Sequence, residues 1–220
     1  MQDEEKDNKA LNAADKGAEA PGKEPETYNF YAFMDRMKYI KRWALMRSVR
    51  EENIMEHSQM VVMLAHCLAV INNEIFKGCA DASKTALYAV YHECSEVMTG
   101  DLPTPIKYFN KSMRGAYADL EDRASDKLLG TLPKELQDEF AKYMKPDKDS
   151  YEYKLMKAAD RLSAYIKCVE EGRCGNDEFV KAEKSIKEDL DSRHMPEVEY
   201  FFKHFMPGFS LPLDDLEGLE

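Results

Sequence analysis

The sequence lacks any excess of positive charge and any long apolar run. Its formal net charge is -11 at pH 7, which argues against binding to a nucleic-acid polymer, because such binding relies on Lys and Arg to neutralise phosphates. The longest apolar run, MVVMLAHCLAVI, contains a histidine and is shorter than the roughly twenty residues that a membrane-spanning helix needs. The N-terminus has no apolar segment of the kind found in secretory signals. We therefore expect no membrane contact and a cytoplasmic location.

Paired cysteines are also missing. The five cysteines form no CxxC motif, and their number is odd, so a disulfide framework is not indicated. We interpret them as reduced thiols, which suits a cytoplasmic protein. Burial at helical positions is the simplest fate for such thiols.

Aromatic residues are absent from residues 1–26, which are rich in Ala, Lys, Glu, Asp, Gly and Pro. A segment of this composition cannot bury enough apolar area to offset the entropy lost on ordering, so we predict a disordered, acidic and polar N-terminal tail. Aromatic residues begin abruptly at TYNFYAF. One domain over residues 27–220 is expected, and its length allows a real hydrophobic core.

Apolar residues recur at helical spacing through this domain, and neither a strand pattern nor a repeat is found. Asn53 followed by Glu56 is typical of a helix start, and Gly100 suits a helix end. The fold class is therefore all-α, an irregular bundle of about seven helices rather than a regular four-helix bundle. The helical segments are expected at about 29–40, 54–76, 83–99, 106–130, 133–143, 150–171, 176–190 and 195–206.

The segment YHECSEVMTGDLPTP concentrates ligand-type side chains at one helix end. If residues 83–99 form one helix, His92 and Glu96 lie about 40° apart and Glu93 lies about 100° from His92. All three could then line one side of a cavity beside the core face. A solvated acidic flank is the plainer alternative.

Two other predicted helices each carry one ligand-type residue among apolar neighbours. His57 lies in the first turn of its helix, where a satisfied core histidine is the commoner explanation. His66 lies about 180° round the same helix, so it cannot share a site with His57 and we take it as structural. Asp160 lies in mid-helix, where aspartate has poor propensity; it could simply pair with Lys157 or Arg161.

Together these residues favour a metal site. Two imidazoles with carboxylates, contributed by three helices, suit a divalent transition metal and leave coordination positions for water and substrate. Such an ion lowers the pKa of a bound water and polarises a phosphoryl oxygen. The residues in question are His57, His92, Glu93 and Asp160.

The order of a histidine, a histidine–acid pair and an aspartate on successive helices resembles the HD-domain phosphohydrolases. Over about residues 28–215, the segments MKYIKRWALMRSVREENIMEHS, YHECSEVMTGDLPTPIKYFN and KAADRLSAYIKCVEEG look like motifs of the bacterial HD-domain 5′-deoxynucleotidases of the YfbR type. The resemblance implies an HD-domain fold and hydrolysis of deoxyribonucleoside 5′-monophosphates by metal-activated water, with ribonucleotides disfavoured. It also implies a homodimer and a divalent ion such as Co or Mn.

The resemblance implies that His57, His92, Glu93 and Asp160 hold the metal, and His57 is counted among the substrate contacts as well. One departure concerns the second acid, because the family has Asp after the histidine and this chain has Glu93. Glutamate binds the same ions but is one methylene longer. We expect activity with an altered metal preference; loss of activity is the alternative.

The resemblance also implies roles around the substrate. Glu96 is the implied catalytic carboxylate next to the attacking water, and Asp101 is implied to act near the sugar and the reacting phosphate. Arg42 and Trp43 match an Arg-Trp pair that holds the phosphate side and helps to select deoxyribose. A guanidinium can hold phosphate through two parallel hydrogen bonds, and a rigid indole could exclude a 2′-hydroxyl. Lys107 is a further candidate phosphate contact.

Two other functions remain open. A broader nucleotidase, triphosphate hydrolase or phosphodiesterase would use the same centre, although a polyphosphate pocket would want more cations than the connector KRWALMRSVR and Lys107 offer. A catalytically silent binding or scaffold protein would keep the metal as a structural element. The apolar face within MPEVEYFFKHFM could be a dimer contact or part of the core.

Overall fold

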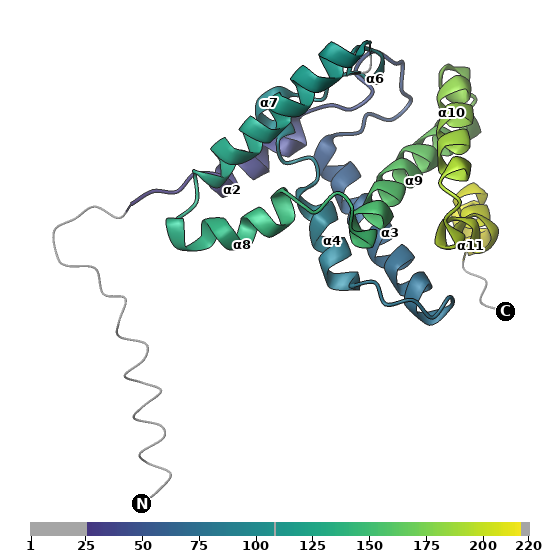
Figure 1. The fold of residues 1–220 in the computed structure, drawn as a ribbon. Helices are drawn as coiled ribbons and strands as arrows, with labels where there is room; N and C mark the ends of the chain where they lie inside the picture. Colours follow the sequence, from purple (N-terminus) through teal and green to yellow (C-terminus); the bar gives the residue numbers. More distant parts are fainter. Residues whose placement is uncertain (1–25, 108, 217–220) are drawn as a thin grey trace, which may run out of the picture.

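The computed structural model describes residues 26–107 and 109–216 (Figure 1). The predicted tail of residues 1–26 lies almost wholly outside these ranges and stays a prediction. Within them the chain forms helices and no strand, and extended backbone pairs only in an isolated bridge between Lys41 and Asn53. The all-α prediction is confirmed.

Seven helices of nine or more residues occur in the described ranges, accompanied by shorter elements that the sequence pattern did not separate. The long helices are α3 (Ile54–Glu74), α4 (Ala82–Tyr91), α7 (Lys111–Leu129), α8 (Lys134–Met144), α9 (Tyr151–Arg173), α10 (Val180–Ser192) and α11 (Pro196–His204). The short ones are α2 (Phe30–Met34), α5 (Glu96–Thr99), α6 (Thr104–Lys107), α12 (Leu213–Leu216) and 3₁₀ segments at Asp35–Tyr39, Asp177–Phe179 and Met206–Ser210.

Side-chain caps fix where the central helices begin. The side chain of Asn53 accepts hydrogen bonds from the backbone N–H groups of Met55 and Glu56, both at 3.0 Å, as the sequence predicted for the start of α3. Ser150 caps α9 in the same way. These caps set the register in which α3 and α9 present their ligand-type side chains.

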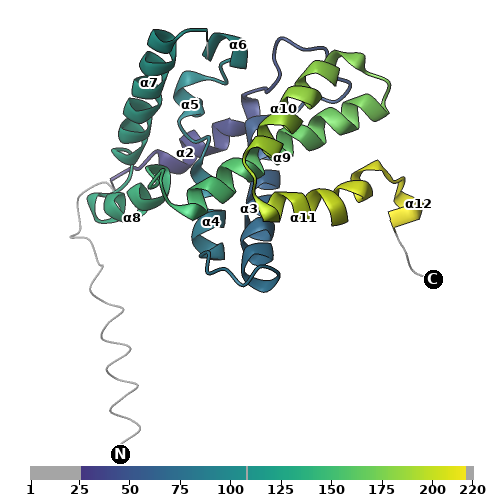
Figure 2. The ribbon, with the colours of Figure 1, turned by 45° about the vertical axis from the view of Figure 1, so that its right-hand side comes forward.

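The packing divides into a main core and a smaller one. Helices α3, α4 and α9 meet in the main core, and α10 and α11 cover it on one side (Figures 1 and 2). Val198 and Phe201 of α11 are buried there, so this apolar face belongs at least partly to the core. On the other side, α2, α7 and α8 enclose the smaller core around Phe30 and Leu128.

Two expectations need correction. Helix α3 is long and apolar enough, by length and composition alone, to cross a membrane, although the apolar run quoted above is too short; half of its most apolar stretch is buried within the protein. The cysteines are all free, but burial holds only for Cys94 and Cys168, whereas Cys79 and Cys174 are exposed.

Candidate active site

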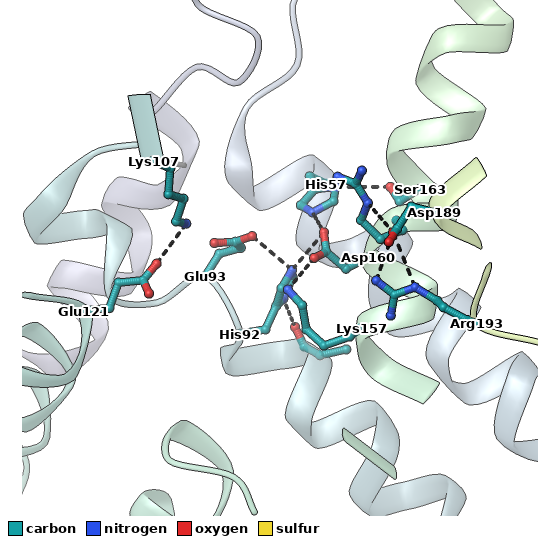
Figure 3. A network of polar contacts seen from close by, with 12 residues as sticks. His57, His92, Glu93, Lys107, Glu121, Lys157, Asp160, Ser163, Asp189 and Arg193 are labelled. Carbon is teal, nitrogen blue, oxygen red and sulfur yellow. Dashed lines mark hydrogen bonds and ion pairs between the residues drawn. The ribbon is translucent and has the colours of Figure 1, made fainter. Parts of the chain in front are cut away.

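The structure brings the four predicted metal ligands together at the centre of the main core. One ligand atom from each residue lies within 4.8 Å of the ligand atoms of the other three. The side chains come from α3, the end of α4, the turn after α4, and α9, and converge as Figure 3 shows. The four residues are His57, His92, Glu93 and Asp160.

His92 provides the test of whether this cluster fits a cation. Its Nδ1 lies 2.7 Å from the carbonyl oxygen of Ala89; since a carbonyl only accepts, Nδ1 carries the proton and Nε2 of the neutral ring carries a lone pair. This Nε2 is buried without a hydrogen-bond partner, and lies 3.4 Å from Glu93 Oε1 and 4.0 Å from Asp160 Oδ1. A buried lone pair beside two carboxylates is costly without a cation, so the residues fit a divalent metal.

His57 is completely buried, and its ring nitrogens lie 3.1 Å from Ser163 Oγ and 3.1 Å from Asp160 Oδ1. Burial, together with the positive charge of Arg42, lowers the pKa of His57 to about 4. The ring is therefore neutral near pH 7 and can donate a proton from one nitrogen only. With Nδ1–H directed to Ser163, Nε2 and the Asp160 oxygen are both electron-pair donors facing the cluster centre.

Asp160 faces the cluster with one oxygen and Lys157 with the other. Its Oδ2 accepts a hydrogen bond from Lys157 Nζ at 2.6 Å. Burial would raise the pKa of Asp160, but the charge of Lys157 outweighs it and holds that pKa well below its ordinary value. The ion pair foreseen as the simple alternative therefore coexists with the inward orientation. Arg161 turns away and pairs with Asp189 at 3.0 Å.

The helix predicted over 83–99 is interrupted, and this corrects the geometry inferred for its acidic residues. Around residues 92–95 the backbone N–H groups of Cys94 and Glu96 bond to carbonyls three residues earlier, those of Tyr91 and Glu93. Hydrogen bonds of this spacing wind the chain more tightly than an α-helix and bring residues i and i+3 to the same side. Glu93 and Glu96 therefore lie on the same side, whereas an unbroken α-helix would have aligned Glu96 with His92 instead.

Glu96 is the first residue of α5 and is buried at 4 % exposure. Burial and the negative charge of Glu93 raise the pKa of Glu96 to about 10. Burial also raises the pKa of Asp101, against the opposing charge of Arg42. A divalent cation at the cluster would counter the charge of Glu93, so these raised pKa values describe the protein without such an ion.

A cavity of about 500 Å³ lies near the cluster, although none of the four cluster residues lines it. Its wall includes Arg161, the neighbour of Asp160 in α9, and Arg42, whose charge acts on His57. The Arg42–Trp43 pair and Asp101 contribute to one wall and α10 to another, so three predicted substrate contacts share one space. The remaining lining residues are Ala44, Leu45, Met46, Pro103, Pro105, Ala164, Ala182, Ser185 and Ile186.

Comparison with known proteins identifies the relatives of this arrangement. The family described as 5′-deoxynucleotidase YfbR-like matches residues 29–209. The chain belongs to the YfbR-like 5′-deoxynucleotidase family. A 5′-deoxynucleotidase of Cronobacter sakazakii is 47% identical over 191 residues, which cover 86% of this chain and 95% of that protein.

Solved structures show the same fold at lower sequence identity. An HD-domain phosphohydrolase from Listeria innocua superposes with a TM-score of 0.72 at 21% identity, covering 86% of this chain and 92% of the other. A cyanophage S-2L HD phosphohydrolase, bound to dA and one catalytic Zn²⁺ ion, gives a TM-score of 0.53 at 18% identity over 83% and 96% of the two chains. The HD-domain fold predicted from the resemblance is thus confirmed.

Within this family framework, Lys107 is placed differently from the other predicted substrate contacts. Its Nζ lies 2.9 Å from Glu121 Oε1 (Figure 3) and 4.4 Å from the centre of the Tyr117 ring. It does not line the cavity. Its positive charge partly opposes the rise in the pKa of Glu96 and Asp101. Its role as a direct contact stays a prediction.

Some residues around the YfbR-like site were not found by sequence reasoning. Ser163 bonds to His57, and Glu52 bonds to both Arg42 and Trp43. Ser163 lies within the motif KAADRLSAYIKC, six residues after its first lysine. Nothing in the sequence marked this serine as a partner of His57. Glu52 lies in a connector without periodicity, where no face of a helix or strand can be assigned. His66, expected to be structural, is exposed on α3 away from the cluster.

Proposed function

We propose that this chain is a divalent-metal-dependent 5′-deoxynucleotidase, which hydrolyses deoxyribonucleoside 5′-monophosphates to deoxynucleoside and phosphate. The observation that carries the proposal is the buried, unpartnered Nε2 of His92 inside a cluster of four ligand-type residues, next to a cavity large enough for a small ligand. Membership of the YfbR-like family, with relatives named 5′-deoxynucleotidase at 47% identity, supports it.

The metal would be held by His57, His92, Glu93 and Asp160. When bound, it lowers the pKa of a water and polarises a phosphoryl oxygen. Cobalt, manganese or a similar ion suits two imidazoles and two carboxylates. Glu93 is one methylene longer than the family's aspartate, so we propose that activity is retained and the order of preference among these ions is altered.

The other residues of the site bind the substrate and handle protons. Arg42 holds the phosphate oxygens from the cavity wall. Trp43 presses on the sugar at C2′ and disfavours ribose. Glu96 takes the proton that the attacking water loses or passes one to the leaving 5′-oxygen, and Asp101 acts near the sugar and the reacting phosphate. Lys107 adds positive charge behind these carboxylates.

Three further properties are proposed on the sequence and the family resemblance. The enzyme acts as a homodimer, in the cytoplasm, and on free nucleotides rather than on nucleic-acid polymers or at a membrane. The formal net charge of -11 supports free nucleotides over nucleic-acid polymers, and the five free cysteines support the cytoplasm.

The test is phosphate release from dAMP and from AMP by metal-stripped protein to which Co, Mn, Mg or Zn is added back. We expect release from dAMP and little from AMP with at least one ion.

The Glu96→Gln variant tests the catalytic carboxylate. It should bind the same ion, measured by calorimetry, and lose turnover by about 10²-fold or more. Equal release from both nucleotides would contradict the sugar selection. Absence of release with every ion, also in Glu93→Asp, would contradict the enzyme assignment.

A further inference from the structure

The backbone at Trp43 has an unusual conformation. Its φ is +57°, in the left-handed region that a bulky residue rarely adopts. Such a conformation persists only where the surroundings hold it, and it is common at ligand-binding sites. Trp43 lies on the cavity wall beside Arg42, so the contacts that hold it also set the shape of that wall.

Glu52 forms one hydrogen bond with Trp43 and two with its neighbour Arg42. Its Oε2 accepts hydrogen bonds from Arg42 Nη1 at 2.9 Å and from Trp43 Nε1 at 3.0 Å. Its backbone carbonyl accepts a third from the N–H of Arg42, at 2.9 Å. The side chains of Arg42 and Glu52 are only 14% and 16% exposed, so water competes weakly for the ion pair. Glu52 itself does not line the cavity.

The other contacts of Trp43 do not direct its indole N–H. The ring packs edge-on against Phe179 with centroids 5.2 Å apart, and the guanidinium of Arg42 lies 5.7 Å from the ring centre. The backbone carbonyl of Trp43 accepts from the N–H of Met46 at 2.8 Å, which closes a turn. Apolar packing restricts where the ring lies but has little directional preference, whereas the hydrogen bond to Glu52 is directional.

We propose that Glu52 is a positioning residue that locks Arg42 and Trp43 into one unit on the cavity wall. A single carboxylate oxygen then couples Arg42 to Trp43 from outside the cavity, because Glu52 does not line it. The effect of Glu52 on sugar selection rests on the proposed function. Its effect on the position of the Trp43 indole does not.

Three substitutions separate the features of this carboxylate. Glu52→Ala removes the acceptor and the charge. Glu52→Asp keeps the charge and withdraws the oxygen by one methylene. Glu52→Gln keeps an acceptor oxygen at the same reach without the charge. Glu51→Ala is the matched control, because Glu51 is the exposed neighbour whose carboxylate pairs with Lys41 rather than with the cavity wall.

Two readouts are needed, one of them independent of activity. Trp43 is the only tryptophan in the chain, so fluorescence emission and acrylamide quenching report on it alone. We expect Glu52→Ala and Glu52→Asp to red-shift the emission and increase quenching, with wild-type behaviour in Glu52→Gln and Glu51→Ala. The ratio of kcat/KM for dAMP to that for AMP should fall about tenfold in the first two variants, as expected for losing a hydrogen bond to a charged group, and should largely recover in Glu52→Gln.

The outcomes distinguish this inference from the proposed function. If wild type selects dAMP and Glu52→Ala and Glu52→Asp retain its fluorescence and its ratio, the inference is wrong and the proposed function stands. An equal effect of Glu51→Ala would also overturn it. If wild type releases no phosphate from dAMP, the proposed function fails, and fluorescence alone decides whether Glu52 holds Trp43. Should Glu52→Ala fail to fold, by circular dichroism, Glu52→Asp against Glu52→Gln decides.

Discussion

The two sides of the site are built by different means. The metal-ligand cluster comes from α3, the end of α4 and α9, whose apolar faces pack together in the main core. The cavity wall with Arg42 and Trp43 lies in the connector between Tyr39 and Ile54, which has no helix or strand. There the shape depends on a few hydrogen bonds to buried or half-buried carboxylates, Glu52 and Glu171.

Substitutions on the two sides of the site should therefore have different effects. The ligands lie on packed helices, so their positions do not depend on any one polar contact. Substituting one ligand should therefore weaken metal binding while the fold is retained. The connector buries little apolar surface, and several of its side chains are exposed. Losing one carboxylate there should therefore change the wall or the stability without touching the metal.

The largest expected effect is on the cluster. His92→Asn removes the unpartnered Nε2, so metal affinity should fall by at least about 100-fold, more than is typical for losing only a neighbour of a ligand. Calorimetry should show this loss, and added metal should no longer raise the unfolding temperature. His66→Asn, at an exposed position of α3 away from the cluster, is the control. Unchanged metal binding in His92→Asn would remove this residue from the cluster.

The cluster side of the site was largely predictable. Helical periodicity and capping placed His57 and Asp160 on separate helices, and the motif resemblance joined them to His92 and Glu93. The break after α4 was not predictable, because Cys94 and Val97 continue the apolar pattern across it. Its hydrogen bonds are local, but the choice between α and tighter winding depends on tertiary packing, which periodicity does not report.

The connector side was predictable only through resemblance. Arg42 and Trp43 were named because they match a family pair, whereas Glu52 has no periodic neighbours that would assign it a direction. The α10 wall, with Ser185 and Ile186, was missed for a different reason. These residues face the cavity through long-range packing of α10 on α9, and nothing in their local sequence distinguishes a cavity wall from a core face.

A second prediction concerns the stability of the connector. Glu171 is 2% exposed; its carboxylate accepts bonds from the backbone N–H groups of Val49 at 2.8 Å and Arg50 at 3.3 Å and from the side chains of Lys167 and Asn176. Burial would raise the pKa of Glu171, but the hydrogen bonds from Lys167 and from the connector outweigh it and lower the pKa to about 2.

Because this folded pKa lies below the ordinary value, the unfolded chain binds the proton more readily. The stabilisation is therefore complete above about pH 4.5 and is lost as the pH falls towards 2. It amounts to about 3 kcal/mol at neutral pH. Glu171→Gln should lower the free energy of unfolding by about that amount at pH 7 and flatten its slope between pH 4.5 and 2, measured by urea denaturation. An unchanged slope would show that the carboxylate does not hold the connector.

A third, smaller effect is coupling between Glu52 and Trp43. Trp43→Phe keeps an aromatic ring and removes the indole N–H. If Glu52 acts through that N–H, combining Trp43→Phe with Glu52→Ala should cost less than the sum of the two single changes, with an interaction energy of about 1 kcal/mol in the kcat/KM for dAMP. Additive losses would mean that Glu52 acts mainly on Arg42.

The smallest effect is expected from Glu93→Asp, which tests whether the cluster is as rigid as the comparison implies. Restoring the shorter acid of the family moves the carboxylate back by one methylene, while Glu93 has its Oε1 only 3.4 Å from His92 Nε2 as it stands. Since α3, α4 and α9 fix the other ligands, the ion rather than the helices should adjust. Relative affinities for Co, Mn and Zn should then shift by less than about tenfold, because the ligand remains a carboxylate and only its length changes. A large change in the unfolding temperature of the metal-free protein would instead show that the turn after α4 changes its conformation. This part of the cluster would then be as deformable as the connector.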